Sequence, residues 1–259
     1  MGLMRSLSPA EIVAQLHAAR FQVHDPWNDR PGFAIKNIVF MGMGEPMDNV
    51  DAVLAAIRTM TDRNAYAIAP VHVTVSTMGR TDGIRRYGEF MLQPGFHRLN
   101  LAVSLNAPND RIRSEIMPIN RAEPIASLME ALVAFPKRPN AAICMEYVLI
   151  PGVNDAPEHC DEVCALLRPL RCSLNVIPYN PRRGSPWPAP EEESVQAFVR
   201  RAIANGQFCK RRGTKGRSAM AACGQLGNER IRARRFVEEN AKETVQIRLP
   251  DGAERPRGA

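Results

Sequence analysis

The sequence lacks long hydrophobic runs and any C-x-x-C pair, and its first residues do not resemble a secretory leader. Even the most apolar stretch, residues 141–150, is interrupted by Glu146, which argues against a membrane-spanning helix. The N-terminus carries an acid at Glu11 and has none of the charged head, apolar middle and small-residue cleavage site of a signal peptide. We therefore expect a cytoplasmic protein, and 259 residues that are 45% hydrophobic suffice for one large domain.

The cysteines show no disulfide or zinc pattern. All six are expected to be reduced thiols in a cytoplasmic chain. Cys160 and Cys164 are four residues apart on an expected helix, but no further ligand follows at zinc or iron–sulfur spacing. We favour helix packing over metal binding for this pair.

Positive charge is concentrated near the C-terminus. The formal net charge is +7, and residues 210–235 carry nine Lys or Arg against one acid, Glu229. Such a cluster is either a solvated basic face or the site of a polyanionic partner, RNA being the first candidate.

Short apolar runs alternate with helical patterns along the chain. The runs, rich in β-branched residues, are 36–41, 71–76, 98–104, 143–150 and 172–178. Between them, residues 49–62, 157–169 and 191–206 place apolar residues at helical spacing. Repeated strand–helix units predict a parallel sheet, because a parallel crossover usually contains a helix. The fold class expected is α/β, an α/β barrel or part of one.

Each expected strand is followed by a polar loop. The loops are GMGEP, TMGR, LNAPND, PGVND and YNPRRG. Loops at the carboxyl ends of parallel strands build the active sites of such folds, although Gly, Pro, Asn and Asp also dominate ordinary turns. In the first loop, the glycines permit close approach of a ligand, and Glu45 before Pro46 places a carboxylate on a stiffened turn. An ammonium group is the ligand that such a turn would hold.

Cys223 admits two interpretations from its surroundings. It follows two alanines and precedes Gly224, with Lys215 and Arg217 nearby. A sterically open thiol among cations favours a reactive thiolate, whereas a small buried hydrophobe is the usual fate of a free cysteine. The residues themselves leave both open.

Taken together, the motifs resemble a known family. MGMGEP, VTVSTMG, LAVSLNAPND, MEYVLIPGVND, NVIPYNP and AACGQL occur in the order and at the spacings of the RlmN/Cfr family. These are radical S-adenosylmethionine (SAM) enzymes that methylate adenosine in ribosomal RNA. The resemblance runs from about residue 3 to residue 226 and implies a partial (βα) barrel, closest to the RlmN type.

The resemblance also implies a set of SAM contacts. The GEP loop, here Gly44 and Glu45, would hold the amino-acid end of SAM. Residues of three further loops would complete the site: Ser76, Ser104, Leu105, Asn106 and Asn180. Members of the family commonly have histidine where this chain has Asn106. Asparagine still forms hydrogen bonds but does not titrate near neutral pH, so this contact departs from the pattern.

Cys223 corresponds to the family's methyl carrier. By the resemblance, one SAM methylates this sulfur, and a second is cleaved by a reduced 4Fe–4S cluster to give the radical that activates the methyl group. Carbon 2 of the adenine is the acceptor in RlmN and carbon 8 in Cfr. The partners implied are 23S rRNA, tRNA for some members, and an electron donor such as flavodoxin or ferredoxin.

The family's cluster motif, C-x-x-x-C-x-x-C, occurs nowhere in the sequence. Cys160 and Cys164 have the first spacing, but residue 167 is leucine. The chain begins at the point that follows the cluster loop in the family, so we expect an N-terminally truncated form without the first barrel strand. The domains expected are a barrel over residues 1–237 and a charged, flexible tail over residues 238–259. The alternatives are a Cfr-type carbon-8 methyltransferase and a non-catalytic RNA- or SAM-binding remnant.

Overall fold

The computed structural model describes residues 5–25, 28–41, 44–136, 141–181 and 185–213. Its main element is a six-stranded, wholly parallel sheet in which each strand lies beside its successor along the chain. The strands are β3 (Ile38–Phe40), β4 (Val73–Thr77), β5 (Asn100–Ser104), β6 (Ile143–Leu149), β7 (Cys172–Pro178) and β8 (Cys209–Arg211). β3 and β8 are therefore the two edges of the described sheet.

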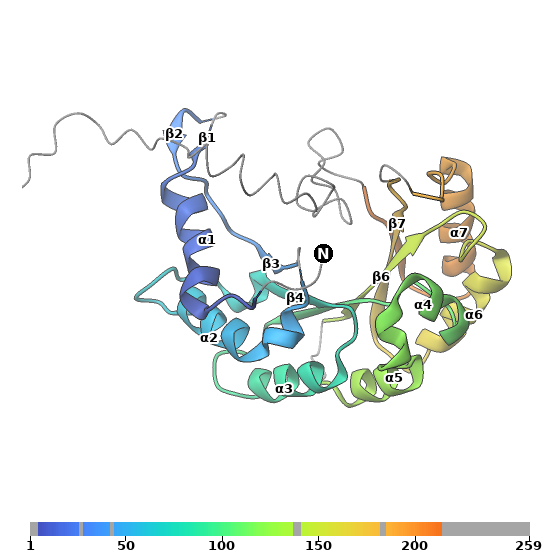
Figure 1. The fold of residues 1–259 in the computed structure, drawn as a ribbon, viewed down its shortest axis with the longest axis horizontal. Helices are drawn as coiled ribbons and strands as arrows, with labels where there is room; N and C mark the ends of the chain where they lie inside the picture. Colours follow the sequence, from blue (N-terminus) through green and yellow to red (C-terminus); the bar gives the residue numbers. More distant parts are fainter. Residues whose placement is uncertain (1–4, 26–27, 42–43, 137–140, 182–184, 214–259) are drawn as a thin grey trace, which may run out of the picture.

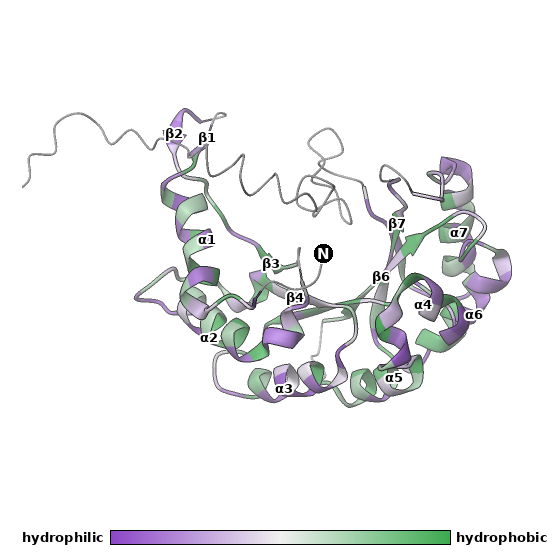
Figure 2. Cartoon of the chain, viewed as in Figure 1, coloured by the Kyte–Doolittle hydropathy of each residue, from purple (hydrophilic) through white to green (hydrophobic). Residues whose placement is uncertain are grey.

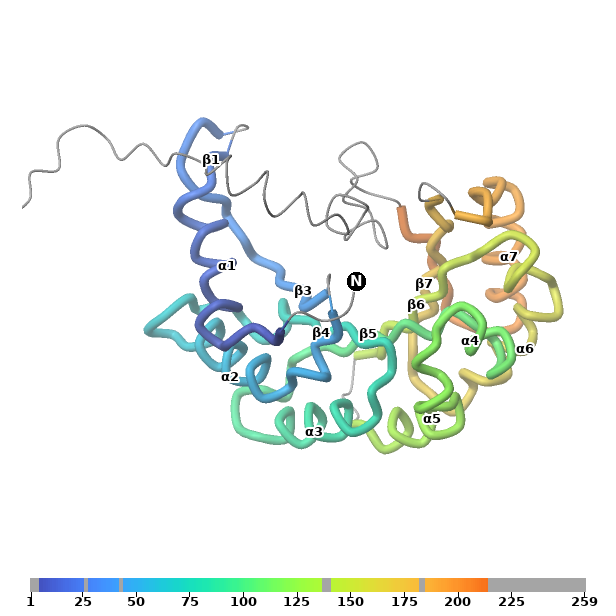
Figure 3. The backbone as a smooth tube through the Cα atoms, viewed as in Figure 1, coloured from blue at the N-terminus to red at the C-terminus, as the bar shows by residue number. Residues whose placement is uncertain are grey.

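Helices connect the strands and cover one face of the sheet. They are α1 (Pro9–Phe21), α2 (Val50–Thr61), α3 (Thr81–Met91), α4 (Asp110–Ile116), α5 (Ile125–Ala134), α6 (Pro157–Leu167) and α7 (Glu192–Ala204). Three short 3-10 turns, η1 (Pro46–Asn49), η2 (Pro70–His72) and η3 (Pro118–Arg121), and a small antiparallel pair, β1 (His24–Asp25) with β2 (Arg30–Pro31), complete the described elements. The layers form a crescent with helices along its convex side and strands along its concave side (Figure 1). The tube follows the chain from α1 at one tip to α7 at the other (Figure 3).

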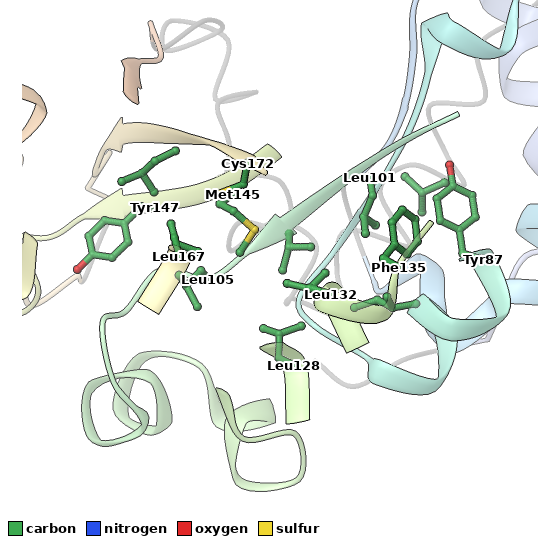
Figure 4. Packing of buried hydrophobic residues seen from close by; sticks show 14 of the residues in the cluster. Tyr87, Leu101, Leu105, Leu128, Leu132, Phe135, Met145, Tyr147, Leu167 and Cys172 are labelled. Carbon is green, nitrogen blue, oxygen red and sulfur yellow. The ribbon is translucent and has the colours of Figure 1, made fainter. Parts of the chain in front are cut away.

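The hydrophobic core lies between the sheet and these helices. Alternate strand residues such as Val75, Leu101 and Met145 point into it and are at most 3% exposed. Leu132 of α5 and Leu167 of α6 approach the sheet from the helical side (Figure 4). Around the outer helices, hydrophobic and hydrophilic residues alternate as expected for one buried and one solvated face (Figure 2).

The opposite set of strand residues faces the concave side and includes several polar residues. Register places Ser104 beside Glu146, and Glu146 in turn beside Asn175. Ser76 belongs to the same face, since it lies beside Ala102, two residues before Ser104. Among the described elements, the helices cover only the convex side, and the concave side of the sheet carries these polar side chains.

The predicted fold class is confirmed, as a mostly parallel sheet with flanking helices. The five predicted strands correspond to β3 to β7, and the three predicted helices to α2, α6 and α7. The described part of the sheet does not close into a barrel, because β3 and β8 do not pair. The predicted tail, residues 238–259, lies outside the described residues. In the part of the chain that is described, no helix is both long and apolar enough to span a bilayer.

Candidate ligand-binding face of the sheet

The GEP loop follows β3 at the carboxyl edge of the sheet. Gly44 adopts φ +96°, a left-handed conformation that favours glycine, and a Cβ added there would meet no atom within 4 Å. The space beside this backbone is therefore open to a ligand.

Glu45 is oriented by backbone groups of two loops. Its Oε1 accepts the N–H of Met47 at 2.9 Å, and its Oε2 accepts the N–H of Met78 at 2.7 Å. Met78 follows β4, so the carboxylate joins the loops after β3 and β4. Each carboxylate oxygen retains acceptor capacity for a further donor.

Ser76, Ser104 and Glu146 meet on the concave face. Glu146 Oε2 lies 3.5 Å from the hydroxyl of Ser76 and 3.4 Å from that of Ser104. The Glu146 backbone carbonyl accepts the N–H groups of Leu105 and Asn106 at 3.0 and 3.2 Å. One residue of β6 therefore contacts four of the residues predicted to bind SAM.

Arg212 supplies the counter-charge to Glu146. Its Nη1 lies 2.5 Å from Glu146 Oε1, and the Glu146 side chain is only 4% exposed, against 44% for Arg212. A buried carboxylate needs such a partner, because desolvation of an unpaired charge is costly. Arg212 follows β8, so this ion pair joins the last described strand to the centre of the sheet.

The Asn106 side chain forms hydrogen bonds within the protein. The residue has φ +59°, which asparagine tolerates better than most residues. Its Oδ1 accepts the N–H of Val148 at 2.9 Å, and its Nδ2 contacts the sulfur of Met117 at 3.3 Å. The side chain therefore holds the loop against β6, in a position where the family commonly has histidine.

Leu105 and Asn180 are placed differently from the two serines. The Leu105 side chain is fully buried in the core, which leaves only its backbone for a ligand. Asn180 is half-buried and follows β7 at the same carboxyl edge. The Leu105 side chain therefore lies on the opposite side of the sheet from the carboxylate of Glu146.

Arg113 supports this edge from inside the molecule. Among the described residues it is the largest fully buried side chain. Its guanidinium N–H groups donate to the carbonyls of Leu105, Ser104, Met78 and Glu123 and to the Oδ1 of Asn120, at 2.5–3.4 Å. Burial lowers the pKa of the Arg113 guanidinium, while Asp110 and Glu123 oppose that shift. A Cβ on Gly79 would lie 3.0 Å from Arg113 Nη2, so glycine there leaves room for the guanidinium.

The Cys160–Cys164 pair lies in the core, as helix packing predicts. Cys160 is fully buried and Cys164 is 5% exposed. Their mutual hydrogen bond raises the pKa of Cys160 and lowers that of Cys164 to about 7. Nothing in these contacts requires a metal.

The described residues do not fit a 4Fe–4S cluster. They contain no group of three His, Cys, Asp or Glu side chains placed to hold a metal ion. Cys144, Cys172 and Cys209 lie at or next to the amino ends of β6, β7 and β8, whereas the candidate face continues to the carboxyl ends. Burial raises the pKa of Cys172 to about 11 and that of Cys209 to about 12, which disfavours thiolate ligands.

Cys223 and most of the basic segment lie outside the described residues. Of that segment, residues 210–213 are described, and they include Lys210, Arg211 and Arg212. Arg211 pairs with Glu192 of α7 at 2.7 Å, and Arg212 pairs with Glu146 on the concave side. Arg211, the last residue of β8, and Arg212, which follows it, thus point to opposite sides of the sheet.

Glu146 and Arg113 contact the residues of the candidate face, but the sequence patterns did not predict either of them as part of it. Glu146 had a signal, since it is the lone carboxylate in an apolar strand and a buried acid rarely lacks a function or a partner. Arg113 had no comparable signal, because its helix also carries the exposed Arg111.

The candidate face offers three kinds of group to a ligand. The GEP loop supplies open backbone and an acidic side chain, which suit an α-amino group. The concave centre supplies two hydroxyls and a buried, charge-compensated carboxylate, which suit a sugar. An amino acid joined to a nucleoside, as in SAM, fits this donor set.

Comparisons with known proteins identify relatives of the chain, although no family model matches it. The dual-specificity RNA methyltransferase RlmN of Syntrophus aciditrophicus is 39% identical over 230 residues, covering 89% of this chain and 63% of the relative. Its counterpart in Campylobacter lari is 41% identical over 225 residues, covering 87% and 60%.

A solved structure shows the same relationship. The radical SAM methyltransferase from Sphaerobacter thermophilus superimposes with a TM-score of 0.78 at 37% identity, covering 87% of this chain and 63% of that protein. The chain thus spans somewhat less than two thirds of the length of the proteins it matches. In sequence and in fold, the chain is a homologue of RlmN-type dual-specificity RNA methyltransferases and of a radical SAM methyltransferase.

Proposed function

We propose that this chain provides the SAM-binding face and the methyl-carrying Cys223 of an RlmN-type methyltransferase acting on carbon 2 of an adenosine in 23S rRNA, with tRNA as a second substrate. The observation that carries the proposal is the meeting of Ser76, Ser104, Leu105 and Asn106 around Glu146. Four positions implied by the family share one contact residue on the face that a ligand would reach.

Gly44 and Glu45 would hold the amino-acid end of SAM. The open space at Gly44 admits the ligand backbone, and the Glu45 carboxylate accepts hydrogen bonds from its ammonium group. When bound, SAM supplies an electrophilic methyl group. Cys223, flanked in sequence by Lys215 and Arg217, would accept it as the thiolate that these cations favour.

The basic segment is the proposed contact for RNA. Nine cations within residues 210–235 would neutralise backbone phosphates, which makes the affinity strongly dependent on salt. The chain itself holds no cysteines at the C-x-x-x-C-x-x-C spacing of the family's cluster ligands. An electron donor such as flavodoxin or ferredoxin would be needed only by a form of the protein that holds the 4Fe–4S cluster.

Two other functions remain in competition. A Cfr-type enzyme would place the methyl group on carbon 8. A non-catalytic RNA- or SAM-binding protein is favoured by the absent cluster motif.

Because the sequence holds no C-x-x-x-C-x-x-C motif, the three are distinguished by expressing the chain with an N-terminal extension that carries this motif, in cells without their own adenine-2 methyltransferase. Mass spectrometry of 23S rRNA and tRNA locates the methyl group. Calorimetry measures the affinity for SAM, and filter binding measures the affinity for an rRNA fragment. The C223A variant is the matched control. Carbon-2 methylation that C223A abolishes would support the proposal. Methylation at carbon 8, or binding of both ligands without methylation, would replace it with the corresponding alternative. Methylation that persists in C223A would refute the role of Cys223.

A further inference from the structure

We infer that Glu146 is a specificity-determining residue that recognises the ribose hydroxyls of the ligand, together with the hydroxyls of Ser76 and Ser104. The inference rests on the proposed binding of SAM and names a contact for its sugar. The two oxygens of the buried Glu146 carboxylate differ in the lengths of their hydrogen bonds.

The two carboxylate oxygens of Glu146 have different hydrogen-bond donors. Oε1 lies 2.5 Å from Arg212, a short, charge-assisted contact. Oε2 has the two serine hydroxyls at 3.4 and 3.5 Å, beyond the roughly 2.5–3.0 Å usual between hydroxyl donors and oxygen acceptors. Oε2 is therefore an acceptor held only by long contacts, although its side chain is only 4% exposed.

The surrounding charges select a neutral donor. An anion would face the Glu146 carboxylate, and a cation would compete with Arg212, which already neutralises it. A hydroxyl group carries no charge and donates to a carboxylate. The ligand group expected at Oε2 is thus an alcohol.

The arrangement of the two serines favours a pair of alcohols. Ser76 on β4 and Ser104 on β5 approach Oε2 from neighbouring strands, and each hydroxyl both donates and accepts. A vicinal diol can donate one proton to Oε2 and a second to a serine oxygen. The ribose of a nucleoside carries such a diol.

The same strand also fixes the loop above the site. The Glu146 carbonyl accepts the N–H groups of Leu105 and Asn106, so the carboxylate and this loop move together. Glu45, joined through Met78 to the loop after β4, lies toward the β3 edge. A ligand with its amino-acid end at Glu45 would extend its nucleoside toward the centre of the sheet, where Glu146 lies.

The test compares SAM with its 2′-deoxy and 3′-deoxy analogues by calorimetry on the full chain. We expect the wild-type chain to bind at least one deoxy analogue about tenfold more weakly, as for the loss of a hydrogen bond to a charged group. E146Q should bind SAM more weakly and lose most of this discrimination. E192Q is the matched control, because Glu192 pairs with the adjacent Arg211 on the opposite side of β8 and should leave all three affinities unchanged.

The S104A variant provides a second test if E146Q does not fold. It removes one hydroxyl without unpairing the buried charges and should reduce the discrimination against one analogue. Equal affinities of the wild-type chain for SAM and both analogues would overturn the inference while leaving SAM binding intact. Undiminished discrimination in a folded E146Q would overturn it as well. Absence of any SAM binding by the wild-type chain would instead refute the proposed function, and this inference with it.

Discussion

The carboxylate of Glu45 and the backbone N–H of Met78 lie 2.7 Å apart and join the loops after β3 and β4. The carbonyl of Met78 in turn accepts a hydrogen bond from Arg113, at 2.5 Å. Because Arg113 also reaches Ser104 and Leu105, three successive loops at the carboxyl edge share one network. A ligand at this edge would meet groups whose positions are set before it arrives.

Replacing Glu45 with glutamine is expected to weaken SAM binding about tenfold, because a neutral amide loses the charge-assisted contact with the ligand's ammonium group. Calorimetry with SAM measures the change. D51N is the control, since Asp51 is 78% exposed and pairs with Arg86 on the helical side. Equal affinities of E45Q and the wild-type chain would exclude Glu45 from the site.

Replacing Arg113 with methionine is expected to lower the free energy of unfolding by at least about 1–3 kcal/mol, the usual cost of one buried acceptor left without a donor. The substitution leaves the carbonyls of Leu105, Ser104 and Met78 buried without their donor. Urea denaturation measures the loss. R111M, on the same helix but exposed, should change stability by less than about 0.5 kcal/mol. A similarly small change in R113M would show that these carbonyls find other donors.

The sequence predicted the strands well because buried parallel strands are short apolar runs rich in β-branched residues. β7 coincides with its predicted range, and β6 ends one residue earlier. β8 was missed, since three residues of which two are basic carry no such pattern. Its place in the sheet depends on pairing with β7, which is a tertiary contact.

The candidate site was predicted in part, and only through motifs. The positions of Ser76 and Ser104 came from a family resemblance, whereas their meeting at Glu146 depends on register across three strands. The engaged side chain of Asn106 could not be inferred either, because its partner Val148 is forty-two residues away. Contacts of this kind follow from the folded sheet and leave no local pattern.

Acid is expected to weaken the contact between α6 and α7 through Asp161. Hydrogen bonds from Arg201 and Asn205 lower the pKa of this carboxyl from 3.8 to about 2. A depressed folded-state pKa stabilises the fold above the ordinary pKa, and this contribution is lost as the pH falls from 3.8 toward 2. Urea denaturation across this range should give a shallower pH dependence for D161N than for the wild-type chain. D82N, which removes an exposed acid, should retain the wild-type slope.

The outer edge of β3 is expected to promote association. β3 pairs only with β4 in the described sheet, and Val39 is 49% exposed. V39K should reduce light scattering at high protein concentration, because a lysine on an edge strand opposes strand pairing between molecules. I203K removes a similarly exposed hydrophobe from α7 and is the control. Equal scattering by V39K and the wild-type chain would count against association through β3.

Anaerobic incubation with iron and sulfide is expected to leave the chain without a stoichiometric 4Fe–4S cluster. The reason is the absence of C-x-x-x-C-x-x-C from the sequence. Iron and sulfide analysis with visible absorbance measures the outcome. One cluster per chain would contradict this expectation.

The burial of five thiols makes the native chain suitable for site-selective labelling. Cys160, Cys164, Cys172 and Cys209 are at most 7% exposed, and burial raises the pKa of the half-buried Cys144 to about 11. Maleimides and similar probes therefore find little to modify in the described part of the molecule. Rapid labelling of the unmodified chain would mark Cys223, which would then carry a fluorescent or spin reporter without prior replacement of any other cysteine.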